Sequence, residues 1–158
     1  MYIQPIISDT NDSNIYILNN NTIIDSGLNE YFTINRISKY TNPKNIKKIL
    51  LTHSHYDHFG GSQLLINKYK SKIGVSYDDS IYINNDEYSV SYLFNKKLKY
   101  KITPNFYYKD GDIISVGINK NTNEEDYLEV IQTPGHTIGS VCFYSKKLKV
   151  LFSGDTIF

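Results

Sequence analysis

Residues 52–58 read Thr52-His53-Ser54-His55-Tyr56-Asp57-His58, and this one stretch holds three of the protein's four histidines together with a carboxylate. It closes an apolar run over residues 46–52, which is typical of a strand buried on both faces. Open α/β sheets place their ligands in loops at the ends of such strands. The sequence therefore predicts a ligand site at this strand end.

The spacing of these side chains suits metal ions. His53 and His55 are two residues apart, so both imidazoles can turn to one side and chelate one cation. Asp57 and His58 can then face a second position. Imidazole and carboxylate ligands suit zinc, manganese or iron, and the absence of thiolates argues against a structural zinc site. We therefore interpret the stretch as a metal site rather than as an ordinary polar loop.

Three further polar residues stand at the ends of expected strands. His136 follows a Pro-Gly turn in residues 133–137, Asp155 lies in Ser153-Gly154-Asp155-Thr156, and Asp25 precedes Ser26-Gly27. Taken singly, a turn histidine or a strand-end carboxylate is an ordinary turn or cap residue. Because the other histidines all lie in the cluster, His136 becomes a further candidate ligand. Asp25 is a candidate for orienting a ligand imidazole through its other nitrogen.

Length and composition narrow the class of protein. The 158 residues are enough for one domain over residues 1–158 and too few for two. A net charge of +1 argues against a nucleic-acid surface, which needs clustered and uncompensated basic residues. No apolar run reaches the length of a membrane span, so we expect neither a nucleic-acid nor a membrane partner. The single cysteine, Cys142, cannot form an internal disulfide, and we expect a reducing, cytoplasmic setting.

Turn residues and apolar periodicity divide the chain into short strands and a few helices. The expected strands cover residues 2–7, 14–18, 22–25, 46–52, 73–76, 112–116, 127–133, 140–145 and 149–153. The expected helices cover residues 30–40, 62–69 and 86–94, with a Lys-rich loop before residue 106 and a polar turn over 119–126. Strands that alternate with helices early and then form hairpins indicate a mixed α/β fold whose sheets are covered by helices.

Together these segments resemble the metallo-β-lactamase superfamily. The pattern His53-x-His55-x-Asp57-His58 is similar to its signature, and Gly60-Gly61 follows as in many members. Residues 133–137 and 154–158 are similar to motifs of the hydroxyacylglutathione hydrolase (glyoxalase II) branch, and residues 24–27 to the strand and turn that open the family's core. The resemblance implies an α/β (α+β) fold, a four-layer αββα sandwich with a metal site at one edge of its two sheets.

The resemblance also implies a centre with two divalent metal ions, zinc first, with iron or manganese as alternatives. The implied ligands are His53, His55 and His136 for the first metal, Asp57 and His58 for the second, and Asp155 as a bridge. The implied reaction is hydrolysis of a small-molecule thioester, or a related ester or lactone, by a metal-bound hydroxide. Asp57 would be the catalytic residue that helps to orient this nucleophile.

The end of the chain departs from the family pattern. In this family a further histidine, downstream of the bridging aspartate, completes the second metal site. Here the sequence ends three residues after Asp155, and no histidine remains unassigned. We therefore expect a fragment that lacks the closing strand and outer helix of the second sheet and the glutathione-binding helices, or a chain that another chain completes.

Two other interpretations stay open. A persulfide dioxygenase shares this fold and holds a single iron, for which His53, His136 and Asp155 would be the set. The complete Asp57-His58 pair favours the hydrolase instead. The end at Phe158 favours a non-catalytic remnant that binds metal weakly or not at all. A nuclease of the same superfamily has little support, because the charge balance offers no RNA-binding arm. The oligomeric state stays open.

Overall fold

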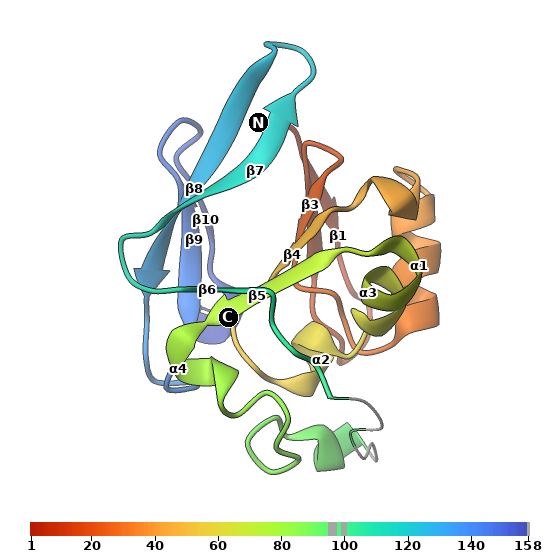
Figure 1. The fold of residues 1–158 in the computed structure, drawn as a ribbon, viewed down its shortest axis with the longest axis vertical. Coiled ribbons are helices and arrows are strands. Elements are labelled where there is room, and N and C mark those ends of the chain that lie inside the picture. Colours follow the sequence, from red (N-terminus) through yellow and green to blue (C-terminus); the bar gives the residue numbers. More distant parts are fainter. Residues whose placement is uncertain (95–97, 99–100, 158) are drawn as a thin grey trace.

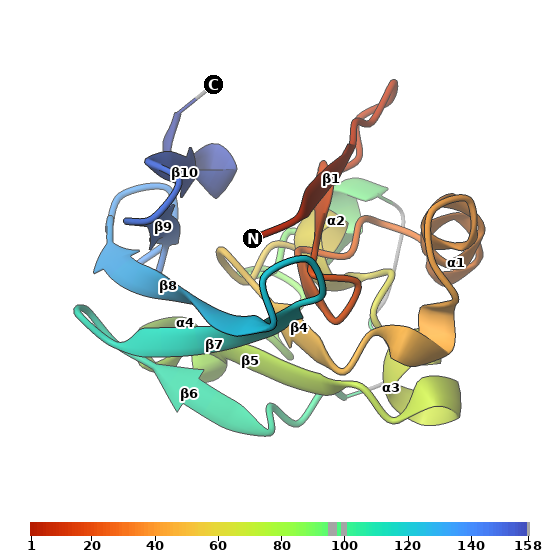
Figure 2. The ribbon, with the colours of Figure 1, turned by 90° about the horizontal axis from the view of Figure 1, so that it is seen from above.

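Two β-sheets lie face to face in the computed structural model, which describes residues 1–94, 98 and 101–157 (Figures 1 and 2). The first sheet has the strand order β1-β2-β3-β4-β5-β6. Its strands are β1 (Ile3–Ile6), β2 (Ile15–Leu18), β3 (Thr22–Ile24), β4 (Lys48–Leu50), β5 (Lys72–Ser76) and β6 (Phe106–Tyr108). The pairs from β1 to β3 are antiparallel, and the pairs from β3 to β6 are parallel.

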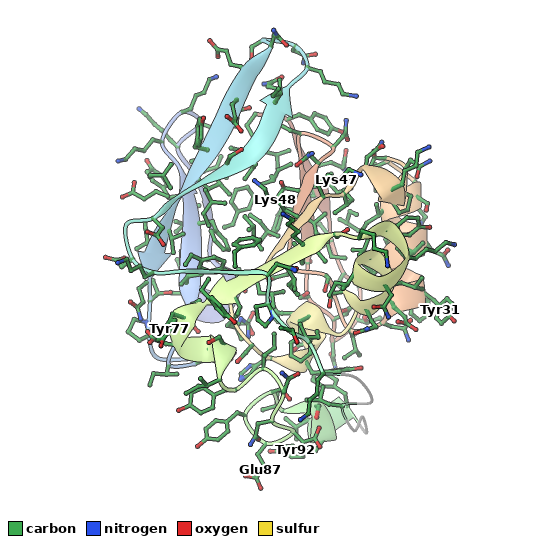
Figure 3. The ribbon with its side chains drawn as sticks, viewed as in Figure 1. Tyr31, Lys47, Lys48, Tyr77, Glu87 and Tyr92 are labelled. Atoms are coloured by element: carbon green, nitrogen blue, oxygen red, sulfur yellow. The ribbon has the colours of Figure 1, made fainter. Side chains whose placement is uncertain are left out.

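The second sheet has the strand order β10-β9-β8-β7, and its pairs are antiparallel. Its strands are β7 (Ile113–Asn119), β8 (Glu124–Gln132), β9 (Val141–Ser145) and β10 (Val150–Phe152). Lys48 of β4, labelled in Figure 3, links the two sheets, because its Nζ donates a 2.7 Å hydrogen bond to the carbonyl of Ser115 on β7.

The helices are short. They are α1 (Glu30–Ser38), α2 (Tyr56–Phe59), α3 (Gln63–Tyr69) and α4 (Tyr77–Ser80), with 3-10 turns η1 (Pro43–Asn45), η2 (Ser91–Phe94) and η3 (Gly154–Thr156). Asn29 caps α1, since its side chain accepts hydrogen bonds from the amides of Tyr31 and Phe32. α1 and α3 lie side by side on the face of the first sheet that is turned away from the second (Figures 1 and 2). Among the described residues, no helix is long and apolar enough to cross a membrane.

Neighbouring residues of the central strands point into different cores, because side chains alternate across a strand. Ile23 and Ile49, which are paired in register on β3 and β4, belong to the core beneath α1 and α3. The next pair, Ile24 and Leu50, belongs to the core between the sheets, together with Phe143 of β9. Parallel strands buried on both faces explain the continuous apolar runs in this half of the sequence.

The expected mixed α/β fold is confirmed, and the described residues form three of the four expected layers. These are the helices α1 and α3, the first sheet and the second sheet. In the described part of the chain, no helix covers the outer face of the second sheet. Ile113, Tyr127 and Leu151 on that face are therefore 59%, 49% and 44% exposed.

Several local expectations were wrong. The structure has an unexpected strand, β6, and the helix expected over residues 86–94 is reduced to η2 after a series of turns. The polar turn expected over residues 119–126 is shorter, because β7 and β8 continue their pairing to Asn119 and Glu124. The ends of β7 and β8 consist mainly of polar residues. Backbone hydrogen bonds pair them, so the apolar pattern of the sequence does not reveal these strands. The expected Lys-rich loop around residues 96–99 lies mostly outside the described residues.

Gly61 lies so close to Ser26 and Thr33 that no larger side chain fits at this position, and a substitution there should destabilise the fold. A Cβ at this position would lie 2.0 Å from the Ser26 carbonyl oxygen and 2.1 Å from Thr33 Oγ1. We expect Gly61→Ala to lower the free energy of unfolding by about 1–3 kcal/mol through overpacking. Urea unfolding measures the loss, and Lys44→Ala on the exposed surface is the control. Equal stability of the two variants would contradict this prediction.

Candidate metal centre

The candidate site residues predicted from the sequence lie in the segments that follow four strands, β3, β4, β8 and β10, with Asp57 and His58 on α2 and Asp155 on η3. These strand ends meet at one edge of the sheets, at the lower end in Figure 1, where α2 and α4 also lie. The structure brings the whole set together in one connected cluster: Asp25, His53, His55, Asp57, His58, His136 and Asp155.

The other three imidazoles pack around that of His53. Its ring centroid lies 4.6 Å from that of His55, 4.0 Å from that of His58 and 4.7 Å from that of His136. His136 Nε2 lies 2.9 Å from His55 Nδ1, although 81 positions separate the two residues in the chain. His53, His55 and His136 each offer a ligand atom within 4.8 Å of the others. This group of three can hold one metal ion.

A second group shares His53 with the first. It consists of His53, His58 and Asp155, whose ligand atoms also lie within 4.8 Å of one another. His58 Nε2 lies 3.2 Å from Asp155 Oδ1 and 3.7 Å from Asp57 Oδ2. The other oxygen of Asp155 lies 3.4 Å from His136 Nε2. Asp155 therefore belongs to the second group and also contacts His136 of the first.

The Asp25 carboxylate fixes the positions of Thr52 and His58. Its backbone has a φ of 55°, and its Oδ1 accepts a 2.8 Å hydrogen bond from the Thr52 amide. Its Oδ2 accepts from the Thr52 hydroxyl at 2.9 Å and lies 2.8 Å from His58 Nδ1. His58 therefore turns its Nε2 toward Asp155, because its Nδ1 is engaged by Asp25.

His53 has a buried nitrogen without a partner. The residue is 1% exposed, and its Nε2 has no hydrogen-bond partner among the described residues. Its Nδ1 lies 3.1 Å from Thr52 Oγ1, whose hydrogen goes to Asp25, so that Nδ1 can donate to this oxygen. The Nε2 lone pair is then available to a cation. The residues present therefore fit a bound metal ion.

Two of the imidazoles are held neutral. Burial, reinforced by the other three histidines, holds the pKa of His53 well below its usual value. Burial and then the neighbouring His136 and His58 lower the pKa of His55 to about 4. Both rings therefore carry lone pairs at neutral pH, as metal ligands must.

His58 is in the opposite state. Burial disfavours its charged form, but the carboxylates of Asp25, Asp155 and Asp57 outweigh this effect and raise the pKa of His58 to about 10. The hydrogen bond to His58 in turn lowers the pKa of Asp155. Burial raises the pKa of Asp57. In the metal-free chain a proton on His58 thus balances the surrounding carboxylates.

Two clefts reach the cluster from different sides. One, of about 300 Å³, is lined by Asp57, His58 and Asp155 among others. The other, of about 370 Å³, is lined by His55, His136, Asp79, Tyr82, Glu87, Tyr88 and Ile138 among others. Both clefts combine polar and apolar side chains, with Tyr16 and the exposed Ile157 in the first and Tyr88 and the exposed Ile138 in the second.

Sequence reasoning missed two residues of the site. The sequence predicts Thr52 only as the end of a strand, yet its hydroxyl joins Asp25 to His53. Asp79 lies in a stretch that periodicity left undefined, and it contacts both histidine-bearing loops. The pattern Ser76-x-x-Asp79 at the end of a strand is a helix-start signal that could have drawn attention to it. Nothing in the sequence signals the role of the Thr52 hydroxyl.

The opposite states of the histidines predict how the stability of the metal-free chain depends on pH. His55 has a lowered folded pKa, so its contribution is lost as the pH falls from 6.5 through about 4. His58 has a raised folded pKa, so its contribution is full below 6.5 and is lost as the pH rises through about 10. Urea unfolding of chelator-treated protein measures both losses. We expect His55→Gln to reduce the acid-side loss and His58→Gln the alkaline-side loss. Unchanged profiles in these variants would refute the assignment.

Curated relatives of the chain are hydroxyacylglutathione hydrolases. It is 32% identical over 117 residues to that of Francisella philomiragia, covering 74% of this chain and 36% of the relative. The Pelagibacter ubique protein is 33% identical over 125 residues, covering 77% and 41%. The Buchnera aphidicola protein is 32% identical over 158 residues, covering 96% and 50%. The chain thus spans half the length, or less, of these relatives.

Solved structures and a family model agree with the observed fold. The BLEG-1 B3 metallo-beta-lactamase superposes with a TM-score of 0.80 at 22% identity, over 99% of this chain and 73% of that one. GOB-18 from Elizabethkingia meningoseptica gives 0.61 at 27% identity, over 94% and 52%. The family model described as Metallo-beta-lactamase superfamily matches residues 9–158. The match spans nearly the whole chain, and the protein belongs to the metallo-beta-lactamase superfamily.

Proposed function

We propose that this chain carries the active site of a metal-dependent hydrolase that cleaves a thioester or a related ester. The proposal rests on one observation: four imidazoles and the Asp155 carboxylate converge in two groups that share His53, and His53 Nε2 has no partner in the described part of the chain. The relatives named hydroxyacylglutathione hydrolase support the thioester class, because an acylglutathione is a thioester.

The first metal position in this proposal is held by His53, His55 and His136. Their ligand atoms lie within 4.8 Å of one another, and they come from two separate loops. Imidazole ligands suit zinc first, with iron or manganese as alternatives. The lowered pKa of His55 supports this assignment, because the neutral ring needs to lose no proton before it binds.

The second position in this proposal is held by Asp57 and His58, and Asp155 bridges the two. The two oxygens of Asp155 lie 3.2 Å from His58 Nε2 and 3.4 Å from His136 Nε2, which is the placement a bridging carboxylate needs. Asp25 would act through His58 by holding its ring orientation.

Two divalent cations bound here would lower the pKa of a coordinated water and polarise the carbonyl of the substrate. The protein's own residues would orient the reacting groups. Asp57, partly buried at the edge of the 300 Å³ cleft, is our candidate for positioning the nucleophile. Burial of His53 and His58 would keep water away from one side of the centre.

The substrate in this proposal is a small molecule. The 370 Å³ cleft beside His55 and His136 has the size of a small-ligand site, and Tyr88 and Ile138 give it apolar surface. The net charge of +1 gives no support to a nucleic-acid substrate. The cytoplasmic setting belongs to the proposal as well, and it rests on the sequence alone.

Metal content and thioester hydrolysis of the purified chain test this function. We expect about one to two zinc, iron or manganese ions per chain by elemental mass spectrometry, and hydrolysis of an acylglutathione that a chelator abolishes. Bound iron with oxygen consumption on a persulfide would instead support the dioxygenase. Absence of stoichiometric metal after reconstitution would refute the proposal and favour the non-catalytic remnant.

Asp155→Asn should separate the bridging role from general charge effects. An amide keeps the shape but removes the negative charge between the two positions, so we expect loss of one bound ion and a fall of about 100-fold or more in hydrolysis. The control is Asp110→Asn. It changes an exposed carboxylate that accepts a hydrogen bond from the backbone amide of Gln132. Metal content and rate that match this control would contradict the bridging assignment.

A further inference from the structure

Asp79 is a fully buried carboxylate outside the metal-ligand set. It lies on α4, directly after β5, and is 0% exposed. Its Oδ2 accepts 2.8 Å hydrogen bonds from the Ser54 amide and the Thr137 hydroxyl, and its Oδ1 accepts one from the Gly139 amide at 2.8 Å. Such a group is costly to bury unless both oxygens are bonded, and here both are.

These hydrogen bonds lead to the two loops that carry the first metal position. Ser54 stands between His53 and His55, and Thr137 follows His136 directly. The two loops belong to different sheets, since one follows β4 and the other follows β8. Asp79 comes from a third segment and joins them at the point where the His55 and His136 rings meet.

The junction is tightly packed. A Cβ on Gly139 would lie 2.5 Å from the Asp79 amide nitrogen and 2.3 Å from Ser76 Oγ, so the loop approaches α4 as closely as glycine allows. The Thr137 hydroxyl is also 2.7 Å from Ser140 Oγ, which ties the turn after His136 to itself. Displacing the carboxylate would therefore move the turn that presents His136.

The carboxylate has no cationic partner in the described part of the chain, and its charge is met by amides and a hydroxyl. Both of its oxygens act as acceptors toward N–H groups. An asparagine of the same shape would turn an NH₂ toward one of these amides, so one loop would lose its contact. A second link between the loops, from the Val141 amide to the Thr52 carbonyl at 2.9 Å, would remain.

We propose that Asp79 is a positioning residue that sets the separation of the His55 and His136 imidazoles and thereby the affinity of the first metal position. The inference rests on the proposed metal site but not on the proposed hydrolysis. A structural role alone would lower stability and leave the affinity unchanged, so the two properties must be measured separately.

The test compares Asp79→Asn with Asp126→Asn in the full chain. Asp126 is also buried, at 2% exposed, but it lies near the start of β8 and pairs with the Met1 amino group and Asn19. Zinc affinity is measured by competition with a chromophoric chelator, and stability by urea unfolding of the metal-free chain. We expect Asp79→Asn to bind zinc about 10–100-fold more weakly, and Asp126→Asn to lose stability but keep its affinity. Thr137→Val, which removes one of the hydrogen bonds, should fall in between.

Wild-type zinc affinity in Asp79→Asn, or a loss no larger than that of Asp126→Asn, would overturn the inference. Imidazole NMR of the metal-free chain gives an independent readout. There Asp79→Asn should shift the resonances of His55 and His136 and leave those of His58 in place. Unshifted signals would also overturn it. Zinc binding without thioester hydrolysis would refute the proposed function and leave this inference standing.

Discussion

The hydrogen bonds of the Asp25 carboxylate are the contacts on which the rest of the site depends. Asp25 directly follows β3 and has a left-handed backbone conformation that costs an L residue about 1 kcal/mol or more. In this position its carboxylate accepts hydrogen bonds from the amide and the hydroxyl of Thr52, and it also lies within hydrogen-bond distance of His58 Nδ1. Because Thr52 lies two residues after the end of β4 and directly before His53, the Asp25 side chain fixes the start of the histidine segment to the neighbouring strand β3. Gly154 packs against the same threonine, where a Cβ would lie 2.5 Å from Thr52 Oγ1, and this brings Asp155 to the same place.

The same edge of the fold holds imidazoles in opposite protonation states a few ångströms apart. Burial and neighbouring histidines lower the pKa of His53 and His55 and keep both neutral, whereas carboxylates keep His58 protonated in the metal-free chain. A cation at the first position would meet ligands ready to bind, but one at the second would have to displace a proton from His58. The two positions therefore differ in how strongly pH governs them, although Asp155 contacts a histidine of each.

Much of this architecture was predictable from local patterns, and the failures have a common cause. The long apolar runs and hairpins appear close to where periodicity predicts them, because burial of one or both faces imposes that pattern. β6, α2 and α4 are only three or four residues long, and elements of that length are stable only through tertiary contacts. The helix expected over residues 86–94 failed for the same reason, since turns and side-chain hydrogen bonds hold that segment instead.

The sequence by itself determined which residues could bind metal, and it placed three of the four histidines within one loop. It also determined the family and the mixed α/β fold, because motif order and strand patterning are local properties of the chain. Whether each residue is a ligand stays a prediction. Only the tertiary structure decided that His136 and Asp155 meet this loop, and that Thr52 and Asp79 support it. Those contacts join strand ends from two sheets, and their distances are set by how the sheets pack, which no local pattern in the sequence specifies.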